Sequence, residues 1–230
     1  MTMRLLVSVR SVDEALLAAR EGADFIDLKE PGQGALGGLP VASIAAIVSA
    51  LRSHRLTLPV SATIGDLPMH ALTEILARVD AVGACGVDYV KVGITRDPAA
   101  SAVLDALAGC GAPAVPVFIA DRGLDEALVA RAAALGFPAL MADTADKRAG
   151  SLFDVAPLAA LRRFIAAARA AGALVGLAGA LQRSHAPALA DLAPDFAGFR
   201  SAVCVGGRSH ALDAQRLREL VEAMRLVAPA

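Results

Sequence analysis

Residues Val60–Gly93 read VSATIGDLPMHALTEILARVDAVGACGVDYVKVG, and this stretch contains one full repeat of the pattern that decides the fold. Short apolar, β-branched runs at Val60–Ile64 and Tyr89–Gly93 predict two strands. A longer stretch between them ends at Gly86, and glycine is typical of the position just past a helix. The order strand, helix, strand predicts two parallel strands joined by a helical crossover.

The same alternation continues toward both ends of the chain. Alanine- and leucine-rich helical stretches recur, the first from Val12 to Glu21 with Ser11 as its expected N-cap. Further glycines of the same kind stand at Gly22, Gly111, Gly136 and Gly172. The predicted strands are Leu5–Val9, Phe25–Lys29, Val60–Ile64, Tyr89–Gly93, Val115–Ile119, Ala139–Asp143, Leu174–Ala178 and Ala197–Arg200.

Eight such units in 230 residues favour a closed barrel over an open doubly wound sheet, which usually has fewer strands. The first turn, Ser8–Val12, lacks the G-x-G-x-x-G pattern of a dinucleotide site, and no Walker A pattern occurs. No linker or shift in composition divides the chain. The sequence therefore predicts an α/β fold, with residues 1–230 forming a single (β/α)8 TIM-barrel domain.

The composition excludes several functional classes. Hydrophobic residues make up 56% of the chain, which is enough for a large core, and the net charge of -1 gives no electrostatic basis for binding nucleic acid or an anionic membrane. The apolar runs are too short to span a bilayer, and the N-terminus lacks the core of a signal peptide. We therefore expect a cytoplasmic protein.

The cysteines and histidines do not indicate a metal site or structural disulfides. The cysteines show no C-x-x-C spacing, which favours small buried thiols, and no two histidines stand at i, i+4. These residues are Cys85, Cys110, Cys204, His54, His70, His185 and His210.

Lysine is rare, and its positions are informative. Of the 22 basic residues only Lys29, Lys91 and Lys147 are lysine. Arginine cannot act as a base or form an imine, whereas lysine can do both. All three lysines fall at or after the carboxyl-terminal parts of even-numbered strands, and the active sites of barrels form at that end. The alternative is that three rare residues fall there by chance.

Two aspartates accompany the lysines. Asp27 precedes Lys29 by two residues, so both side chains lie on one face of a strand, and Asp143 ends the sixth strand. Buried charges on one face are costly unless they meet each other or a ligand. For Asp27, direct proton transfer and orientation of Lys29 both remain open.

Glycine-rich segments follow three strands. Residues 30–38 contain four glycines, which predicts either a backbone that approaches a ligand or a flexible lid. The segments after strands seven and eight stand where barrels commonly bind phosphate through backbone N–H groups, with Arg200 or Arg208 as a possible counter-charge. The candidate phosphate-binding residues are Gly179, Ala180, Arg200, Ser201 and Gly206.

These residues belong to a series of short motifs that is specific in combination. The motifs are Asp27-Leu28-Lys29-Glu30-Pro31, Ser61-Ala62-Thr63-Ile64-Gly65-Asp66, Asp88-Tyr89-Val90-Lys91-Val92-Gly93, Asp143-Thr144-Ala145-Asp146-Lys147 with Leu152-Phe153-Asp154, Leu177-Ala178-Gly179, and Phe199-Arg200-Ser201. From Leu5 to about Arg208 the chain resembles the (5-formylfuran-3-yl)methyl phosphate synthase family, which acts in methanofuran biosynthesis.

The resemblance implies a reaction without a cofactor, in which two molecules of glyceraldehyde 3-phosphate condense to one furan aldehyde phosphate. Atom balance then requires the loss of one phosphate and two waters, so the enzyme is a carbon–oxygen lyase with aldol character. Carried onto this chain, Lys29 is the Schiff-base lysine and Lys91 the proton acceptor. Asp27, Asp143 and Lys147 orient groups, relay protons or assist leaving groups.

Two other functions remain open. The first is a Schiff-base aldolase or phosphosugar isomerase that uses the same lysine but does not release phosphate. The second is a non-catalytic barrel that binds a phosphorylated metabolite and regulates a partner, in which the lysines form inert ion pairs. In each case we expect a small phosphorylated ligand and a homo-oligomer.

Overall fold

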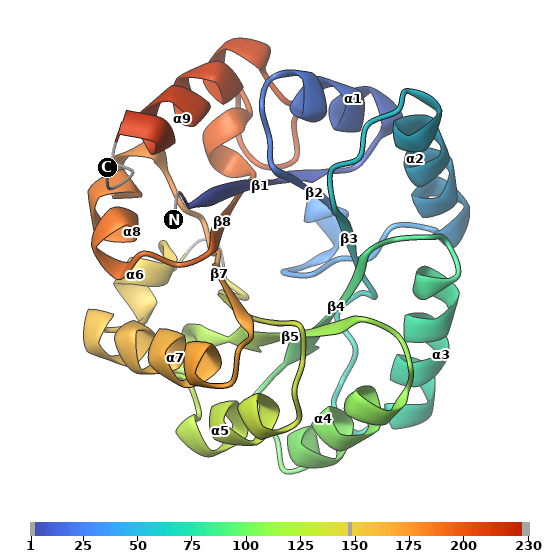
Figure 1. Ribbon diagram of the computed structural model, residues 1–230, viewed down its shortest axis with the longest axis vertical. Coiled ribbons are helices and arrows are strands. Elements are labelled where there is room, and N and C mark those ends of the chain that lie inside the picture. Colours follow the sequence, from blue (N-terminus) through green and yellow to red (C-terminus); the bar gives the residue numbers. More distant parts are fainter. Residues whose placement is uncertain (1–2, 147–148, 227–230) are drawn as a thin grey trace.

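The computed structural model describes residues 3–146 and 149–226, and it contains a closed barrel of eight parallel strands surrounded by helices (Figure 1). The strands follow the order of the chain, and β1 pairs with β8 to close the barrel. They are β1 (Arg4–Val9), β2 (Phe25–Leu28), β3 (Val60–Thr63), β4 (Tyr89–Ile94), β5 (Ala114–Ile119), β6 (Ala139–Asp143), β7 (Leu174–Leu177) and β8 (Phe196–Phe199). The predicted barrel is confirmed, and no predicted strand end differs by more than one residue.

The helices form the outer ring. The α-helices are α1 (Val12–Arg20), α2 (Val41–Ser53), α3 (Leu72–Gly83), α4 (Ala100–Gly109), α5 (Glu126–Ala134), α6 (Leu152–Val155), α7 (Leu158–Ala170), α8 (Ala186–Leu192) and α9 (Ala214–Leu226). Short 3-10 helices are η1 (Pro31–Gln33), η2 (Ala120–Arg122), η3 (Arg183–His185) and η4 (Ser201–Val203). Ser11 caps α1 as predicted, because its hydroxyl accepts a hydrogen bond from the Glu14 N–H.

The core has two layers because the side chains of a strand alternate between two faces. One layer packs the outer faces of the strands against the helices, and the other fills the barrel. Inside the barrel the rings of Phe25 and Phe196 lie with centroids 5.4 Å apart. Gly176 is required beside them, since a Cβ there would approach the Phe196 ring to 2.2 Å. The amino-terminal part of the barrel is therefore a packed apolar interior.

Buried polar side chains gather at the other end of the barrel, where the strands finish. Most of the buried charged or hydroxyl-bearing residues of the described chain belong to the carboxyl-terminal halves of the strands or to the residues just after them. They include Ser8, Asp27, Lys29, Thr63, Asp143 and Arg200, while Ser61 and Lys91 are buried in the first halves of β3 and β4. The barrel is therefore apolar at the amino-terminal end of its strands and polar at the carboxyl-terminal end, which we call the mouth.

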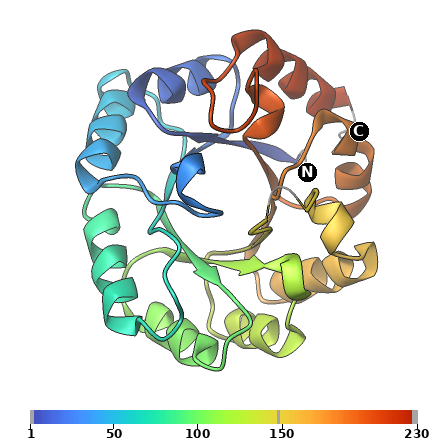
Figure 2. The ribbon, with the colours of Figure 1, turned by 180° about the vertical axis from the view of Figure 1, so that it is seen from behind.

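The glycine-rich segment 30–38 folds back into this mouth, and Figure 2 shows the short helix η1 within the outline of the barrel. Leu36 is 1% exposed and belongs to the apolar cluster inside the barrel. Its N–H donates to the Asp66 carboxylate at 3.2 Å, and the Thr63 hydroxyl donates to the Gly37 carbonyl at 2.9 Å. In this structure the segment is a packed part of the mouth.

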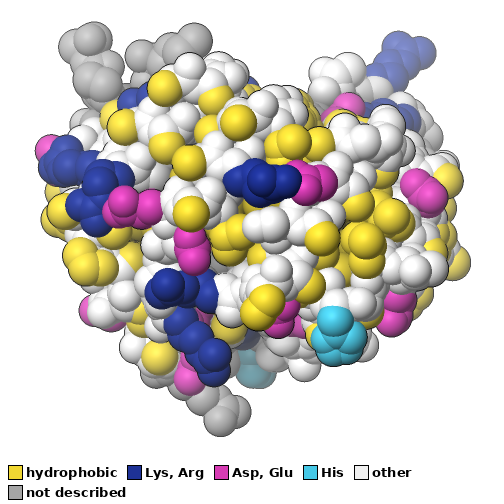
Figure 3. All heavy atoms as spheres, turned by 90° about the horizontal axis from the view of Figure 1, so that it is seen from below, with side chains coloured by type: hydrophobic (Ala, Val, Ile, Leu, Met, Phe, Trp, Pro, Cys, Tyr) yellow, Lys and Arg dark blue, Asp and Glu magenta, His cyan; other side chains and the backbone are white. Residues whose placement is uncertain are grey.

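Arginines on the outer surface pair with acidic residues of neighbouring helices. Arg131 pairs with Asp105, Arg162 with Asp191, and Arg163 with Glu126. Figure 3 shows basic and acidic side chains interspersed among apolar ones on one side of the molecule. Exposed pairs of this kind contribute little to stability. These three arginines are surface cations, while Lys29 and Lys91 are buried in the mouth.

Candidate functional site

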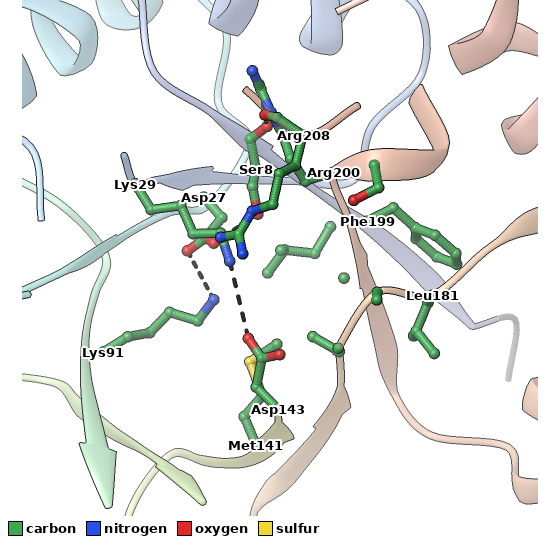
Figure 4. Close-up of a pocket in the computed structure, with 16 residues that line it drawn as sticks. Ser8, Asp27, Lys29, Lys91, Met141, Asp143, Leu181, Phe199, Arg200 and Arg208 are labelled. Atoms are coloured by element: carbon green, nitrogen blue, oxygen red, sulfur yellow. Dashed lines mark hydrogen bonds and ion pairs between the residues drawn. The ribbon is translucent and has the colours of Figure 1, made fainter. Parts of the chain in front are cut away.

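A pocket opens at the carboxyl-terminal mouth of the barrel, with about 410 Å³ of empty space that includes open solvent. Figure 4 shows Asp27, Lys29 and Lys91 on one side of it and Phe199 and Leu181 on the other. The residues that line it come from β1, β2, β4, β6 and β8 and from the segments that follow β2, β7 and β8. They are Leu6, Ser8, Asp27, Lys29, Lys91, Met141, Asp143, Ala178, Gly179, Ala180, Leu181, Gly198, Phe199, Arg200, Ser201 and Arg208.

Asp27 is the centre of the polar side. Its Oδ1 accepts hydrogen bonds from Lys91 Nζ at 2.8 Å and from Ser61 Oγ at 2.7 Å. Its Oδ2 accepts one from Ser8 Oγ at 3.0 Å. Sheet register explains the arrangement, because Ser8 on β1 and Ser61 on β3 are both direct partners of Asp27 on β2. A carboxylate between two hydroxyls and an ammonium has its hydrogen-bonding capacity well filled.

Opposing effects act on the pKa of Asp27. Burial raises it, because a charged carboxylate loses hydration, while the charges of Lys91 and Lys29 and the hydrogen bonds from Lys91 and Ser61 lower it. The net effect is a pKa below the usual value of an aspartate. Asp27 is therefore an anion at neutral pH, and it holds Lys91 as its ion-pair partner.

Lys91 lies deeper than the sequence suggested, since β4 continues three residues beyond it to Ile94. The side chain is 3% exposed and its ammonium meets Asp27 from two strands away. A long, flexible stem makes this possible and keeps the nitrogen at the wall of the pocket.

Lys29 follows β2 directly and is 6% exposed. Its Nζ donates to the Ala35 carbonyl at 3.3 Å and lies 3.9 Å from Asp143 Oδ2 (Figure 4). Asp143 Oδ1 accepts a hydrogen bond from the Thr144 N–H at 2.7 Å, which fixes the carboxylate. Four of the predicted catalytic residues, Asp27, Lys29, Lys91 and Asp143, thus meet in one pocket. Lys147, the fifth, lies outside the described residues.

Arg200 reaches the pocket wall, but protein groups already engage its guanidinium. It donates to Glu14 at 2.6 and 3.1 Å, and to the carbonyl oxygens of Ser8, Arg208 and His210 at 3.0, 2.9 and 2.6 Å. A guanidinium has five N–H donors, and these five contacts use all of them. In this arrangement Arg200 holds the end of β1 and the loop after β8 in place, rather than offering donors to a phosphate.

Arg208 is the better counter-charge for an anion. It lines the pocket, and its Nη2 donates to the Gly34 carbonyl at 2.9 Å, which leaves other N–H groups of the guanidinium for a ligand. Burial lowers the pKa of its guanidinium while Asp143 raises it, with a net lowering. An arginine stays charged at neutral pH even so.

The loops after β7 and β8 contribute backbone groups. Gly179, Ala180 and Ser201 line the pocket as the sequence predicted, whereas Gly206 is exposed and does not. Within residues 3–146 and 149–226, no oxygen accepts a hydrogen bond from the N–H groups of Gly179 and Ala180. Ala180 has a φ of 46°, a left-handed conformation that is uncommon outside glycine and concentrates at functional sites.

Ser8, Ser61 and Glu14 had no predicted role. A signal existed for Ser8, a hydroxyl within the apolar strand Leu5–Val9, because such a residue needs a buried partner. Among the described residues no cluster of three or more His, Cys, Asp or Glu residues suits a metal ion. Within the same ranges, every helix is too short or too polar to cross a bilayer.

Comparison with known proteins identifies the family of this chain. Residues 5–221 match the family described as 4-HFC-P synthase. A protein of Methylorubrum extorquens that is described as a candidate (5-formylfuran-3-yl)methyl phosphate synthase is 41% identical to this chain. The match covers 96% of this chain and 92% of that protein. The (5-formylfuran-3-yl)methyl phosphate synthase of Archaeoglobus fulgidus is 34% identical over 96% of this chain and 99% of its own.

Among solved structures, phosphoribosyl anthranilate isomerase of Thermus thermophilus superimposes with a TM-score of 0.69 at 19% identity, covering 98% of this chain and all of that one. This similarity shows the barrel fold alone. Matched over nearly its whole length, the chain belongs to the 4-HFC-P synthase family.

Proposed function

We propose that this protein condenses two molecules of glyceraldehyde 3-phosphate into (5-formylfuran-3-yl)methyl phosphate through an imine on Lys29, as a step of methanofuran-type cofactor biosynthesis. The observation that carries the proposal is a pair of buried lysines, each beside a carboxylate, in one pocket of a chain of this family. Imine formation, enamine chemistry and elimination all need an amine and a group that moves protons, and this pocket holds both.

The ion pair of Lys91 and Asp27 sets the order of proton transfers. Lys91 begins as an ammonium, so it first donates a proton to the hydroxyl that leaves as water when Lys29 attacks the aldehyde. The neutral amine left on Lys91 then removes the proton from the carbon next to the iminium, which gives the enamine. The enamine attacks the second aldehyde and forms the new carbon–carbon bond, and the resulting alkoxide takes the proton that Lys91 removed from carbon. Lys91 ends this sequence as a neutral amine, because the proton that it first gave away left with the water.

Elimination follows from the same iminium, because it withdraws electrons from the neighbouring carbons. Loss of one phosphate and of two waters in total converts the six-carbon adduct to the furan ring. Asp143 assists a proton transfer on the side of the pocket away from Asp27, since its Oδ2 lies 3.9 Å from Lys29 Nζ. Arg208 and the backbone N–H groups of Gly179 and Ala180 bind the phosphate that the product retains. The predicted homo-oligomer stays a prediction.

Borohydride trapping tests the proposal. The protein is incubated with glyceraldehyde 3-phosphate and borohydride, and the reduced adduct is located by peptide mass. An unreduced sample is followed for furan absorbance and free phosphate. We expect one adduct, on Lys29, and one phosphate for every two trioses.

The other outcomes separate the alternatives. An adduct on Lys29 without phosphate release identifies an aldolase or isomerase. An adduct on Lys91 instead overturns the assignment of roles. Absence of both adduct and product contradicts the proposed reaction and favours a binding protein.

A further inference from the structure

The pocket is built from two layers of unlike chemistry. On β1 and β6 the polar residues Ser8 and Asp143 each follow, by two positions, the apolar lining residues Leu6 and Met141. Arg200, which comes directly after β8, follows Gly198 by two positions. Residues two apart point to the same side of a strand, one step deeper in the barrel. Leu6, Met141, Gly198 and Ala178 form what we call the apolar floor of the pocket.

The floor is tightly packed and offers no side-chain N–H or O–H group. Leu6 is 3% exposed and Met141 1%, and both belong with Ala178 to the apolar cluster that fills the barrel. A Cβ on Gly198 would lie 3.1 Å from Ala178 Cβ, 3.3 Å from a Leu6 methyl and 3.3 Å from the Met141 methyl. Three side chains thus converge over Gly198, and its lack of a side chain keeps the floor low.

This surface matches the end of the proposed reaction better than its beginning. A triose phosphate and the six-carbon adduct carry hydroxyl groups, and placing a hydroxyl against carbon without a hydrogen-bond partner is unfavourable. The furan ring has lost those hydroxyls and presents a flat, apolar surface. A floor of this kind therefore stabilises dehydrated species relative to hydroxylated ones, and differential binding of late species accelerates the steps that form them.

We propose that Met141 and Gly198 are specificity-determining residues, which select the planar, dehydrated ring by means of the apolar floor. The inference rests on the proposed function and deepens it. It assigns the charged side of the pocket to bond making and proton transfer, and the floor to the preference for elimination over release of the aldol adduct.

Binding of inert ligands tests the floor without any imine. Calorimetry gives the dissociation constants of (furan-3-yl)methyl phosphate, which has the ring and the phosphate but no aldehyde, and of glycerol 3-phosphate. We expect the wild-type protein to bind the furan ligand more tightly. In Met141→Gln, which keeps the length of the side chain but adds an amide, the preference falls about tenfold, as for other pocket residues that lose apolar complementarity.

Gly198→Ala tests the same surface by raising the floor. We expect the affinity for the furan ligand to fall about tenfold. The affinity for glycerol 3-phosphate, which is held by its phosphate, should change less. Met69→Gln is the matched control, because Met69 is equally buried but packs in the outer core away from the pocket. We expect Met69→Gln to lower the free energy of unfolding about as much as Met141→Gln does, and to leave the preference for the furan ligand unchanged.

A kinetic measurement adds a readout that a purely structural role would not move. In Met141→Gln we expect borohydride trapping on Lys29 to continue at near the wild-type rate, while furan formation falls and a six-carbon aldol adduct is released. If Met141→Gln does not fold, the ligand preferences of the wild-type protein and of Gly198→Ala test the role of the floor instead.

The inference is overturned if the wild-type protein shows no preference for the furan ligand, or if a folded variant keeps that preference within twofold. A wild-type protein with the preference but no Lys29 adduct means that the proposed reaction is wrong while the floor is correctly described. A Lys29 adduct in a wild-type protein without the preference means that the imine chemistry is correct and that the role given to the floor is wrong.

Discussion

Two buried ion pairs lie on either side of Ser8, and they differ in their cation. Asp27 pairs with Lys91 at 2.8 Å, and Glu14 pairs with Arg200 at 2.6 Å. Ser8 joins them, since its hydroxyl donates to Asp27 and its carbonyl accepts from Arg200. In both pairs the side chains are less than one tenth exposed.

The difference separates structure from chemistry. The Arg200 guanidinium has an acceptor for each N–H and cannot lose its proton, so this pair is a permanent tie between α1, β1 and the loop after β8. Lys91 borders the pocket and can give up its proton, so its pair can take part in a reaction. The sequence uses lysine at the two buried, pocket-lining positions next to the aspartates and arginine at the tie.

The largest expected effect comes from Lys29→Arg. The charge beside Asp143 is retained but no imine can form, so we expect no borohydride adduct and a loss of furan formation greater than about 10⁴-fold, as for other covalent nucleophiles. The unfolding midpoint in denaturant should stay close to that of the wild type. Measurable furan formation by this variant would contradict the role of Lys29.

Lys91→Arg tests whether Lys91 must lose its proton. The arginine can still pair with Asp27, so if a permanent cation were sufficient the variant would be active. We expect furan formation to fall by about 10²–10⁴-fold, the range for loss of a general acid–base group. Rates are measured at saturating substrate, and circular dichroism serves as the control for folding.

Glu14→Ala addresses the other ion pair, and here the expected loss is in stability. It leaves Arg200 buried without its partner anion, which costs about 3–5 kcal/mol of unfolding free energy. Urea denaturation measures this. Asp191→Ala, which removes the partner of the exposed Arg162, is the control and should have little effect. An equally small effect of Glu14→Ala would show that the tie is dispensable.

The smallest expected effect concerns Ser61, and it has a pH dependence. Because the folded pKa of Asp27 is lowered, its contribution to stability is full above the unfolded value of about 3.9 and is lost as the pH falls through the folded pKa. Ser61→Ala removes one cause of the lowering. It should cost about 1 kcal/mol above pH 5. It should also raise the pH at which the acid loss is complete, because the folded pKa moves up toward the unfolded one while the onset, set by the unfolded pKa, stays the same.

Urea denaturation of wild type and Ser61→Ala between pH 2 and 6 checks this prediction. In Asp27→Asn the difference between the serine and alanine variants should lose its dependence on pH in that range. A persistent dependence there would assign the effect to another group.

Much of the fold was predictable from sequence because its signals are local. Short β-branched runs, helical stretches and terminal glycines repeat along the chain, and a strand or helix depends mainly on its own residues. The lysines stood out for a similar reason, since their scarcity and their place near strand ends can be seen without knowing any contact. The pairing of Lys91 with Asp27, 64 positions away in sequence, could not be seen in that way.

The sequence by itself determined the barrel, its eight strands, and the gathering of Asp27, Lys29, Lys91 and Asp143 at one end, because parallel strands of similar length bring their carboxyl ends together. Only the tertiary structure decided which partners these residues have. Arg200 meets Glu14 across 186 positions, the register of β1–β3 brings Ser8 and Ser61 to Asp27, and Met141 meets Gly198 on the floor. Such contacts depend on register and barrel closure, which are properties of all the strands together.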